Sequence, residues 1–238
     1  MKQVPVYNPR DVDVRKMFND IAPKYDFLNH FLSAGIDKCW RRKTIRLLKP
    51  YNPKQILDIA TGTGDLAIKA LSLNPDLVTG VDISEEMLKI ADKKIEKKKL
   101  KNKISLLQAS SEALPFANST FDAATVAFGV RNFKNLEKGI EEIYRVLKKG
   151  GVVAILEFST PSSFPVKQLY LFYFKRILPF IGKIVSKNKN AYIYLPETVL
   201  AFPQGKEFTG LLEKIGFSNV KYLRLSLGIS TIYLAEKS

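Results

Sequence analysis

Two glycines and an aspartate have the spacing of a nucleotide-binding site. Gly62, Gly64 and Ala67 form the pattern Gly-x-Gly-x-x-Ala after an apolar run, and Asp82 lies 20 residues after Gly62. Such a turn lets a ligand approach the backbone, and an acid at this distance binds ribose hydroxyls. The spacing favours a cofactor that contains adenosine. The glycines also fit a turn that needs only close strand–helix packing.

The surrounding residues distinguish between two cofactor classes. Asp58 opens the run D-I-A-T-G-T-G-D, which resembles the glycine loop of methyltransferases, and its charge suits a methionine ammonium rather than a pyrophosphate. The run A-S-S-E-A-L-P-F, which contains Ser110 and Ser111, resembles the loop that flanks adenine in that class. The alternative outside this class is a short NAD-dependent reductase, whose hydride site would be of the Tyr-x-x-x-Lys type. We therefore expect S-adenosylmethionine as the cofactor.

The elements that must hold these residues alternate along the chain as strand and helix. Helices are expected from Leu66, after an N-cap at Ser84, and from Leu136 to Leu147, where Lys149-Gly150-Gly151 would stop the helix. This alternation indicates an α/β, doubly wound and mostly parallel sheet. The expected strands are 55–59, 77–81, 104–107, 121–127 and 152–158.

Both ends of the chain depart from this alternation. Apolar residues at helical spacing predict helices between Val14 and Trp40, and the aromatic, basic segment 159–203 reads as a helical insertion. After a helix over 206–215, strands 220–227 and 229–234 meet at Gly228, which requires an antiparallel pair. The expected fold is that of a class I, Rossmann-like methyltransferase, whose mostly parallel seven-stranded sheet ends in an antiparallel hairpin.

Composition excludes several other classes of protein. The 238 residues carry a net charge of +15, and eight lysines lie between Lys89 and Lys103. Such a run is more typical of a solvated helix face than of a nucleic-acid site, so we expect no nucleic-acid partner. A single cysteine and a single histidine, His30, argue against a disulfide framework, a zinc cluster and a Ser–His–Asp triad, so no metal is expected. With no long apolar run and no signal-peptide pattern, we expect a cytoplasmic protein.

Longer motifs resemble one family. The N-terminal run M-F-N-D-I-A-P-K-Y-D-F-L-N-H-F-L-S-A-G-I-D-K-C-W-R-R, the run F-G-V-R-N and the run R-V-L-K-K-G-G-V-V-A-I-L-E-F-S are similar to signatures of the menaquinone/ubiquinone C-methyltransferases, the UbiE/MenG family. The resemblance spans about residues 14–238. Ala127 stands where members that also make ubiquinone carry a serine, which favours menaquinone alone.

The resemblance implies a role for each site residue. It implies cofactor contacts at Thr63, Asp82 and the pair Ser110-Ser111. From the residues alone, Thr63 could instead shape the turn, Asp82 could cap a helix, and the serines could bind only backbone. The implied reaction is C-methylation of demethylmenaquinol to menaquinol, the final step of menaquinone biosynthesis. The alternatives are the ubiquinone benzoquinol precursor or another lipophilic phenol.

Three residues are the expected catalytic group. Arg131 and Asn132 follow the fourth strand, where Arg131 would stabilise a phenolate or an activated water. The alternative is that Arg131 pairs with Glu157 or Asp122 and braces the loop. Tyr25 would close the N-terminal helices over the methionine end of the cofactor or over the quinol, or would be an ordinary core tyrosine.

The inserted segment suggests how the enzyme reaches a lipid-soluble substrate. Its aromatic residues alternate with lysines and arginines, and Pro179 would break or kink a helix. We expect residues 164–190 to form a lid that docks on anionic lipid at the inner membrane face; a core helix is the alternative. A homodimer is left open. The expected organisation is one domain, 1–238, with a helical cap (1–50), a cofactor-binding core (51–158), the lid (159–203) and a C-terminal helix and hairpin (204–238).

Overall fold

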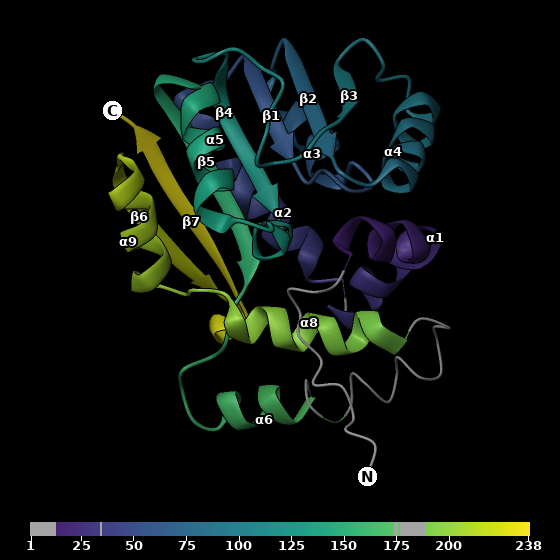
Figure 1. Cartoon of the computed structure of the whole chain (residues 1–238), viewed down its shortest axis with the longest axis vertical. Coiled ribbons are helices and arrows are strands. Elements are labelled where there is room, and N and C mark those ends of the chain that lie inside the picture. The colour runs from purple at the N-terminus through teal and green to yellow at the C-terminus, as the bar shows by residue number, and fades with distance from the viewer. Residues whose placement is uncertain (1–12, 34, 174–175, 177–188) are drawn as a thin grey trace.

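A computed structural model describes residues 13–33, 35–173, 176 and 189–238, without the side chains of 24, 26–32 and 189–193. Helices and strands alternate through the middle of the chain, as the sequence predicts (Figure 1). The helices are α1 (Val14–Leu32), α2 (Asp37–Leu47), α3 (Asp65–Ala70), α4 (Glu85–Lys97), α5 (Leu136–Val146), α6 (Val166–Phe172), α8 (Lys189–Ala201) and α9 (Lys206–Ile215). The strands are β1 (Gln55–Ile59), β2 (Leu77–Asp82), β3 (Ile104–Gln108), β4 (Phe121–Ala127), β5 (Leu147–Phe158), β6 (Phe217–Leu225) and β7 (Ser230–Lys237).

The strands form one seven-stranded sheet in the order β3-β2-β1-β4-β5-β7-β6. The pairs from β3 to β5 are parallel, whereas β7 is antiparallel to both β5 and β6. This confirms the expected class I methyltransferase sheet with its antiparallel hairpin. The order reverses next to β1, so the carboxyl ends of β1, β2 and β4 meet at one edge, where open α/β sheets bind their ligands.

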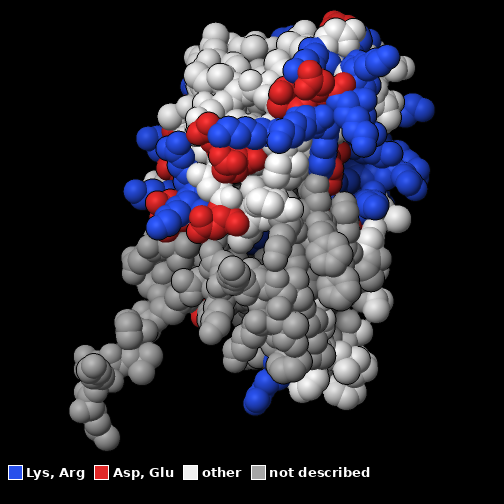
Figure 2. Space-filling model, turned by 90° about the vertical axis from the view of Figure 1, so that its right-hand side faces the viewer, with Lys and Arg blue, Asp and Glu red and all other residues white. Residues whose placement is uncertain are grey.

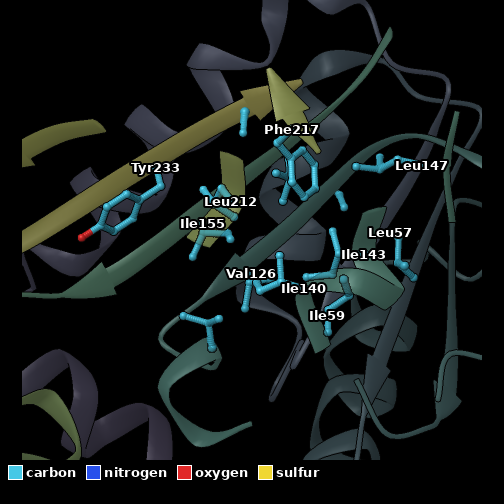
Figure 3. Close-up of a cluster of buried hydrophobic side chains, with 14 of the residues drawn as sticks. Leu57, Ile59, Val126, Ile140, Ile143, Leu147, Ile155, Leu212, Phe217 and Tyr233 are labelled. Atoms are coloured by element: carbon cyan, nitrogen blue, oxygen red, sulfur yellow. The ribbon is translucent and has the colours of Figure 1, made fainter. Parts of the chain in front are cut away.

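Helices cover both faces of the sheet and bury its two cores. Successive strand residues point to opposite faces, so Ile56 and Leu57 enter different clusters. The Leu57 side packs against α5 and α9 through Ile140, Ile143 and Leu212 (Figure 3). The Ile56 side packs against α2, α3 and α4. The strands that lead to this edge are therefore held between two layers of helices.

The start of β5 differs from the prediction, whereas α5 ends within one residue of its predicted end. The helix ends at Val146, and β5 begins at Leu147, so Lys149-Gly150-Gly151 lies inside the strand. Leu147 pairs with Phe121, and the register then shifts before β4 pairs with the later part of β5. Gly150 has φ +73°, and a Cβ at Gly151 would lie 2.8 Å from the Lys148 carbonyl oxygen. The glycines therefore permit an irregularity in the strand rather than a helix stop.

Helices α1 and α8 lie at the carboxyl end of the parallel strands (Figure 1). Asn19 of α1 joins this helix to the start of α4, because its Oδ1 accepts a hydrogen bond of 2.7 Å from the Ser84 hydroxyl. Ser84 caps α4 as predicted, accepting from the Met87 N–H at 3.2 Å. The described residues of segment 159–203 include the helices α6 and α8, and residues 159–165 lead into α6 without helical structure. None of the described helices is long and apolar enough to cross a membrane.

Candidate active site

A cavity of about 1070 Å³ opens at the carboxyl ends of β1, β2 and β4. Among the predicted site residues, it brings together Tyr25, Gly62, Asp82, Ser110, Ser111, Arg131 and Asn132. Asp58 and Thr63 line a smaller adjoining pocket, which shares Tyr25 and Gly62 with the large cavity. All nine predicted residues therefore gather around the same edge of the sheet.

Asp82 lies at the end of β2, where it is tied to the glycine turn. Its Oδ2 accepts from the Gly62 N–H and its Oδ1 from the Ser84 N–H, both at 2.8 Å. Burial raises the pKa of this carboxyl, and the N–H groups of Ser84, Gly62 and Ile83 oppose that rise. Asp82 does not cap α4, because Ser84 does so. A buried acid that lines the cavity beside the glycine turn has the position of a ribose ligand.

Asp58 is buried behind the glycine turn. Its two oxygens accept from the hydroxyls of Thr61 at 2.6 Å and Thr125 at 2.7 Å. Burial raises the pKa of Asp58 to about 6, although these hydrogen bonds and the charge of Arg41 lower it. Asp58 thus favours a cation in the small pocket, because a nearby positive charge would stabilise its ionised form.

The glycine turn itself is fixed by contacts that the sequence did not predict. Lys94 of α4 donates to the Thr63 hydroxyl at 3.0 Å and to the Asp65 carboxylate at 2.9 Å. Ala60, in the first glycine position of the loop, has φ +52°. A non-glycine residue with positive φ carries backbone strain, and such strain concentrates at binding sites.

Ser110 and Ser111 lie on the cavity wall beyond β3, and both are partly exposed. The Ser110 hydroxyl accepts from the Glu112 N–H at 3.2 Å, so it also shapes its own loop. This hydrogen bond leaves the serine free to donate its proton toward the cavity. The loop can therefore offer hydroxyl groups to a ligand.

Arg131 forms a buried ion pair with Glu157. Its Nη1 donates to Glu157 Oε1 at 2.7 Å and to the Phe128 carbonyl oxygen at 2.6 Å. Glu157 has no exposed side-chain surface, and its partner has 7%. Of the two bracing partners that the sequence left open, the structure selects Glu157, since Asp122 pairs with Lys148. Arg131 Nη2 forms no hydrogen bond with the described residues and, unlike Nε, is not sealed from solvent.

Asn132 and Tyr25 occupy other parts of the cavity wall. Asn132 is held near the Phe128 carbonyl oxygen, and its own Oδ1 is buried without a hydrogen-bond partner in the described part of the chain. Tyr25 lies over the glycine turn, because a Cβ at Gly62 would stand 3.8 Å from its Cε1. Its ring contacts Phe18 edge-on at 6.0 Å, so α1 presents an aromatic pair to the cavity.

The sequence analysis missed one wall of the cavity. Tyr194, Thr198 and Ala201 of α8 line it, together with Phe202 and Pro203. No short motif marks these residues, and they lie far along the chain from the glycine turn. The only signal was the aromatic character of the insertion as a whole.

The residues present fit S-adenosylmethionine. The cavity offers an acid beside a glycine turn for ribose, and the adjoining pocket offers a buried acid for an ammonium group. Its volume exceeds that of an ordinary single-ligand pocket, which leaves room for a second molecule beside the cofactor. Among the described residues, no group of three or more His, Cys, Asp or Glu side chains could hold a metal ion.

Two solved structures with a similar fold are methyltransferases. A S-adenosylmethionine-dependent methyltransferase from Thermotoga maritima covers 94% of this chain and 99% of its own, with a TM-score of 0.67 and 21% identity. Phosphoethanolamine N-methyltransferase 2 from Haemonchus contortus, solved with S-adenosylmethionine, covers 92% of this chain and 60% of its own, with a TM-score of 0.61 and 17% identity. The fold is thus that of the class I methyltransferases, and the residues of the site fit their cofactor, S-adenosylmethionine.

Sequence comparison gives the family. A model of the ubiE/COQ5 methyltransferase family matches residues 6–237. A demethylmenaquinone methyltransferase from Bacteroides fragilis is 51% identical over 225 residues, 94% of this chain and 92% of that protein. One from Porphyromonas gingivalis is 47% identical over 231 residues, 96% and 94% of the two chains. The chain belongs to the ubiE/COQ5 methyltransferase family, as its motifs predict.

Proposed function

We propose that this enzyme methylates a ring carbon of demethylmenaquinol to give menaquinol, the final step of menaquinone biosynthesis. The observation that carries the proposal is one cavity with an acid and a glycine turn at one part of its wall and Arg131-Asn132 at another. The relatives in Bacteroides and Porphyromonas are named for this reaction. A relative from Geotalea daltonii, 45% identical over 226 residues (94% of this chain and 96% of that protein), is named for ubiquinone and menaquinone biosynthesis, so the benzoquinol precursor is the second candidate.

The cofactor contacts follow from the positions of the acids. Asp82 would accept hydrogen bonds from the ribose hydroxyls, while Gly62 and Thr63 would border the cofactor at the turn. Asp58 would compensate the methionine ammonium, and Ser110 and Ser111 would flank adenine. When bound, S-adenosylmethionine supplies a methyl group attached to a positively charged sulfur.

The ring carbon becomes a nucleophile when its neighbouring hydroxyl is deprotonated, because phenolate charge is shared with the ortho position. Arg131 supports this step through Nη2, the guanidinium nitrogen that its ion pair leaves available. An arginine stays protonated, so it acts by electrostatic stabilisation of the phenolate or an activated water rather than as a base. Asn132 orders the same end of the cavity, and Tyr25 closes α1 over the glycine turn and excludes water.

The described part of the inserted segment supports docking on an anionic membrane surface. Phe164, Leu169 and Phe172 are 80%, 66% and 60% exposed, and Lys167 and Arg176 are exposed beside them. Tyr170 points inward and packs with Val199 of α8, the helix that lines the cavity. An aromatic and basic surface backed by the substrate wall suits an enzyme that takes a lipid-soluble quinol. The rest of the predicted lid, 174–175 and 177–188, lies outside the described residues.

The test is methyl transfer to the two oxidation states of the same compound. With labelled cofactor under anaerobic conditions, reduced demethylmenaquinol should accept the methyl group and oxidised demethylmenaquinone should not. The quinone has no hydroxyl to deprotonate, so it cannot form the phenolate. Equal labelling of both forms would overturn the proposed chemistry.

A further inference from the structure

Helix α8 carries a buried tyrosine at the cavity, Tyr194, whose hydroxyl has no hydrogen-bond partner among the described residues. Tyr194 lines the cavity, yet only 4% of the residue is exposed. Its hydroxyl makes no hydrogen bond with the described residues, and it is not among the polar atoms sealed in the interior. A buried tyrosine normally finds a partner for its hydroxyl. The free position therefore faces the cavity and awaits a ligand atom.

The neighbours of Tyr194 place this hydroxyl at the reacting end of the cavity. Its hydroxyl is close enough to Arg131 and Glu157 to sense both charges, and α8 contacts the turn η4 (Val130–Asn132). Burial raises the pKa of Tyr194, so at neutral pH it keeps its proton and acts as a donor. Thr198, the other hydroxyl on this wall, donates to the Tyr194 carbonyl oxygen at 2.9 Å. Among the described residues of this wall, Tyr194 is thus the hydroxyl donor that has no hydrogen-bond partner.

Arg131 alone is a limited source of phenolate stabilisation. Glu157 lies 2.7 Å from its Nη1 and cancels much of its charge. A second donor at the same oxygen would supply what the paired guanidinium lacks, since hydrogen bonds to a charged acceptor are the strong ones. Such a donor must be uncommitted and enclosed, and Tyr194 meets both conditions.

We propose that Tyr194 is a further catalytic residue, which donates its phenolic O–H to the quinol oxygen next to the methylated carbon. This inference rests on the proposed function. The quinol hydroxyl gives its proton to water, and the ortho carbon forms a C–C bond to the methyl group while the S–C bond breaks and its electrons stay on sulfur. The ring carbon then loses its hydrogen as a proton, and the oxygen regains one, so each turnover releases a single proton. Throughout, Tyr194 stabilises the negative oxygen.

The test compares Tyr194→Phe with Tyr170→Phe. Tyr170 senses the same two charges, but its hydroxyl is sealed from the cavity, so its removal is a matched control. We expect Tyr194→Phe to lower kcat by about 10- to 100-fold, the effect of one hydrogen bond to a charged group, with cofactor affinity unchanged. The acid limb of its kcat profile should move to higher pH, because without the donor the quinol ionises less readily. Tyr170→Phe should keep the wild-type profile.

Three results would overturn the inference. If the wild type is active and Tyr194→Phe is equally active with an unchanged pH profile, the role of Tyr194 is refuted but the proposed function is not. A loss of activity in Tyr194→Phe that matches a loss of folded protein, with no shift of the pH profile, also refutes it. A wild-type protein that binds S-adenosylmethionine but methylates no quinol refutes the proposed function, and this inference with it.

Discussion

In the proposed mechanism, Arg131 has two roles that a single substitution cannot separate. Its guanidinium braces the loop after β4 through Glu157, and it also lines the cavity where phenolate charge would develop. Removing the arginine alone leaves Glu157 as a buried, unpaired carboxylate, which typically costs about 3–5 kcal/mol of stability. Stability and turnover would fall together, and the loss of turnover would have two explanations.

A double substitution separates the two purposes. Arg131→Met with Glu157→Gln removes both charges, so we expect its free energy of unfolding to recover most of what Arg131→Met alone loses. Turnover should remain about 10²–10³-fold below the wild type, because the electrostatic donor is still missing. Urea unfolding and single-turnover methyl transfer measure the two quantities. If the double variant regains turnover along with stability, Arg131 is only a brace.

Asp58 should show an opposition between stability and binding. Its pKa is 3.8 in its ordinary state and about 6 in the fold, so between these values the folded chain binds more protons than the unfolded chain. Stability therefore falls as pH rises through this window, by about 1.4 kcal/mol per pKa unit. Asp58→Asn should therefore raise the free energy of unfolding above that of the wild type, and this gain should be larger at pH 7 than at pH 4. The same substitution should weaken binding of S-adenosylmethionine.

Denaturant unfolding at both pH values, with calorimetric titration of the cofactor, tests this opposition. Asp76→Asn, which changes an exposed carboxylate, is the control and should leave both quantities unchanged. A gain in stability from Asp58→Asn that is the same at pH 4 and pH 7 would contradict the account. So would unchanged cofactor affinity at pH 7.

The two turns that build the site press against each other. Ala60 after β1 and Phe128 after β4 both have positive φ, +52° and +59°. A Cβ at Gly129 would lie 2.4 Å from the Ala60 Cβ, which is far inside contact distance. Phe128 in turn stacks on Phe158 with ring centroids 4.4 Å apart. The loops after β1, β4 and β5 therefore form one unit that positions Arg131.

Gly129→Ala should disturb this unit. We expect a loss of about 1–3 kcal/mol in the free energy of unfolding, as for overpacking, and weaker cofactor binding. Gly210→Ala is the control: Gly210 lies in α9 with open space around its Cβ, so alanine should be neutral or stabilising by up to about 1 kcal/mol. Thermal unfolding of the two variants at equal concentration makes the comparison. Equal melting temperatures would show that the turns are not in close contact.

The elements that could be predicted from sequence are those with a local physical signal. Buried parallel strands read as apolar runs, so β1 to β5 were placed within a few residues. The position of Asp82 beside the glycine turn could be predicted, because the carboxyl ends of neighbouring parallel strands lie at the same edge of the sheet. The predicted start of β5 was wrong because Gly150-Gly151 resembles a helix stop, and only the pairing of Leu147 with Phe121 reveals that the strand begins before these glycines. Tyr194 could not be predicted, because its position depends on how α8 crosses the sheet edge.

The proposed ligand contacts and the division into cap, core, lid and hairpin remain predictions. The gathering of the nine predicted side chains around two adjoining pockets supports the contacts. Seven of the eight lysines in the run from Lys89 to Lys103 are exposed, and Figure 2 shows one face of the molecule on which lysines and arginines lie among acids. Within the run, Lys89 pairs with Glu85 and Glu86, and Lys101 lies near Asp92 and Glu96. Such exposed pairs contribute little to stability.

On the scale of the whole molecule, the exposed apolar surface of α6 predicts binding to membranes. We expect the enzyme to cosediment with anionic vesicles, to bind neutral vesicles weakly and to dissociate at high salt, because cations at the surface contribute alongside the aromatic rings. Replacing Phe164, Leu169 and Phe172 with serine should reduce binding at least tenfold without changing cofactor affinity.

The matched control removes exposed leucines elsewhere. Leu107 on β3 and Leu223 on β6 are 41% and 39% exposed, and they lie on the two edge strands of the sheet. Their replacement by serine should leave vesicle binding unchanged. If the control variant loses as much binding as the α6 variant, or if binding does not depend on lipid charge, α6 is not the docking surface.

The most direct test of the account is the identity of the methylated product. The purified enzyme is incubated anaerobically with S-adenosylmethionine that carries a deuterated methyl group, and with either demethylmenaquinol or the demethylated benzoquinol. We predict that the label appears on the ring carbon next to a hydroxyl of demethylmenaquinol, at a kcat/KM higher than that for the benzoquinol. Label on a quinol oxygen, or no label in either compound, would contradict the account.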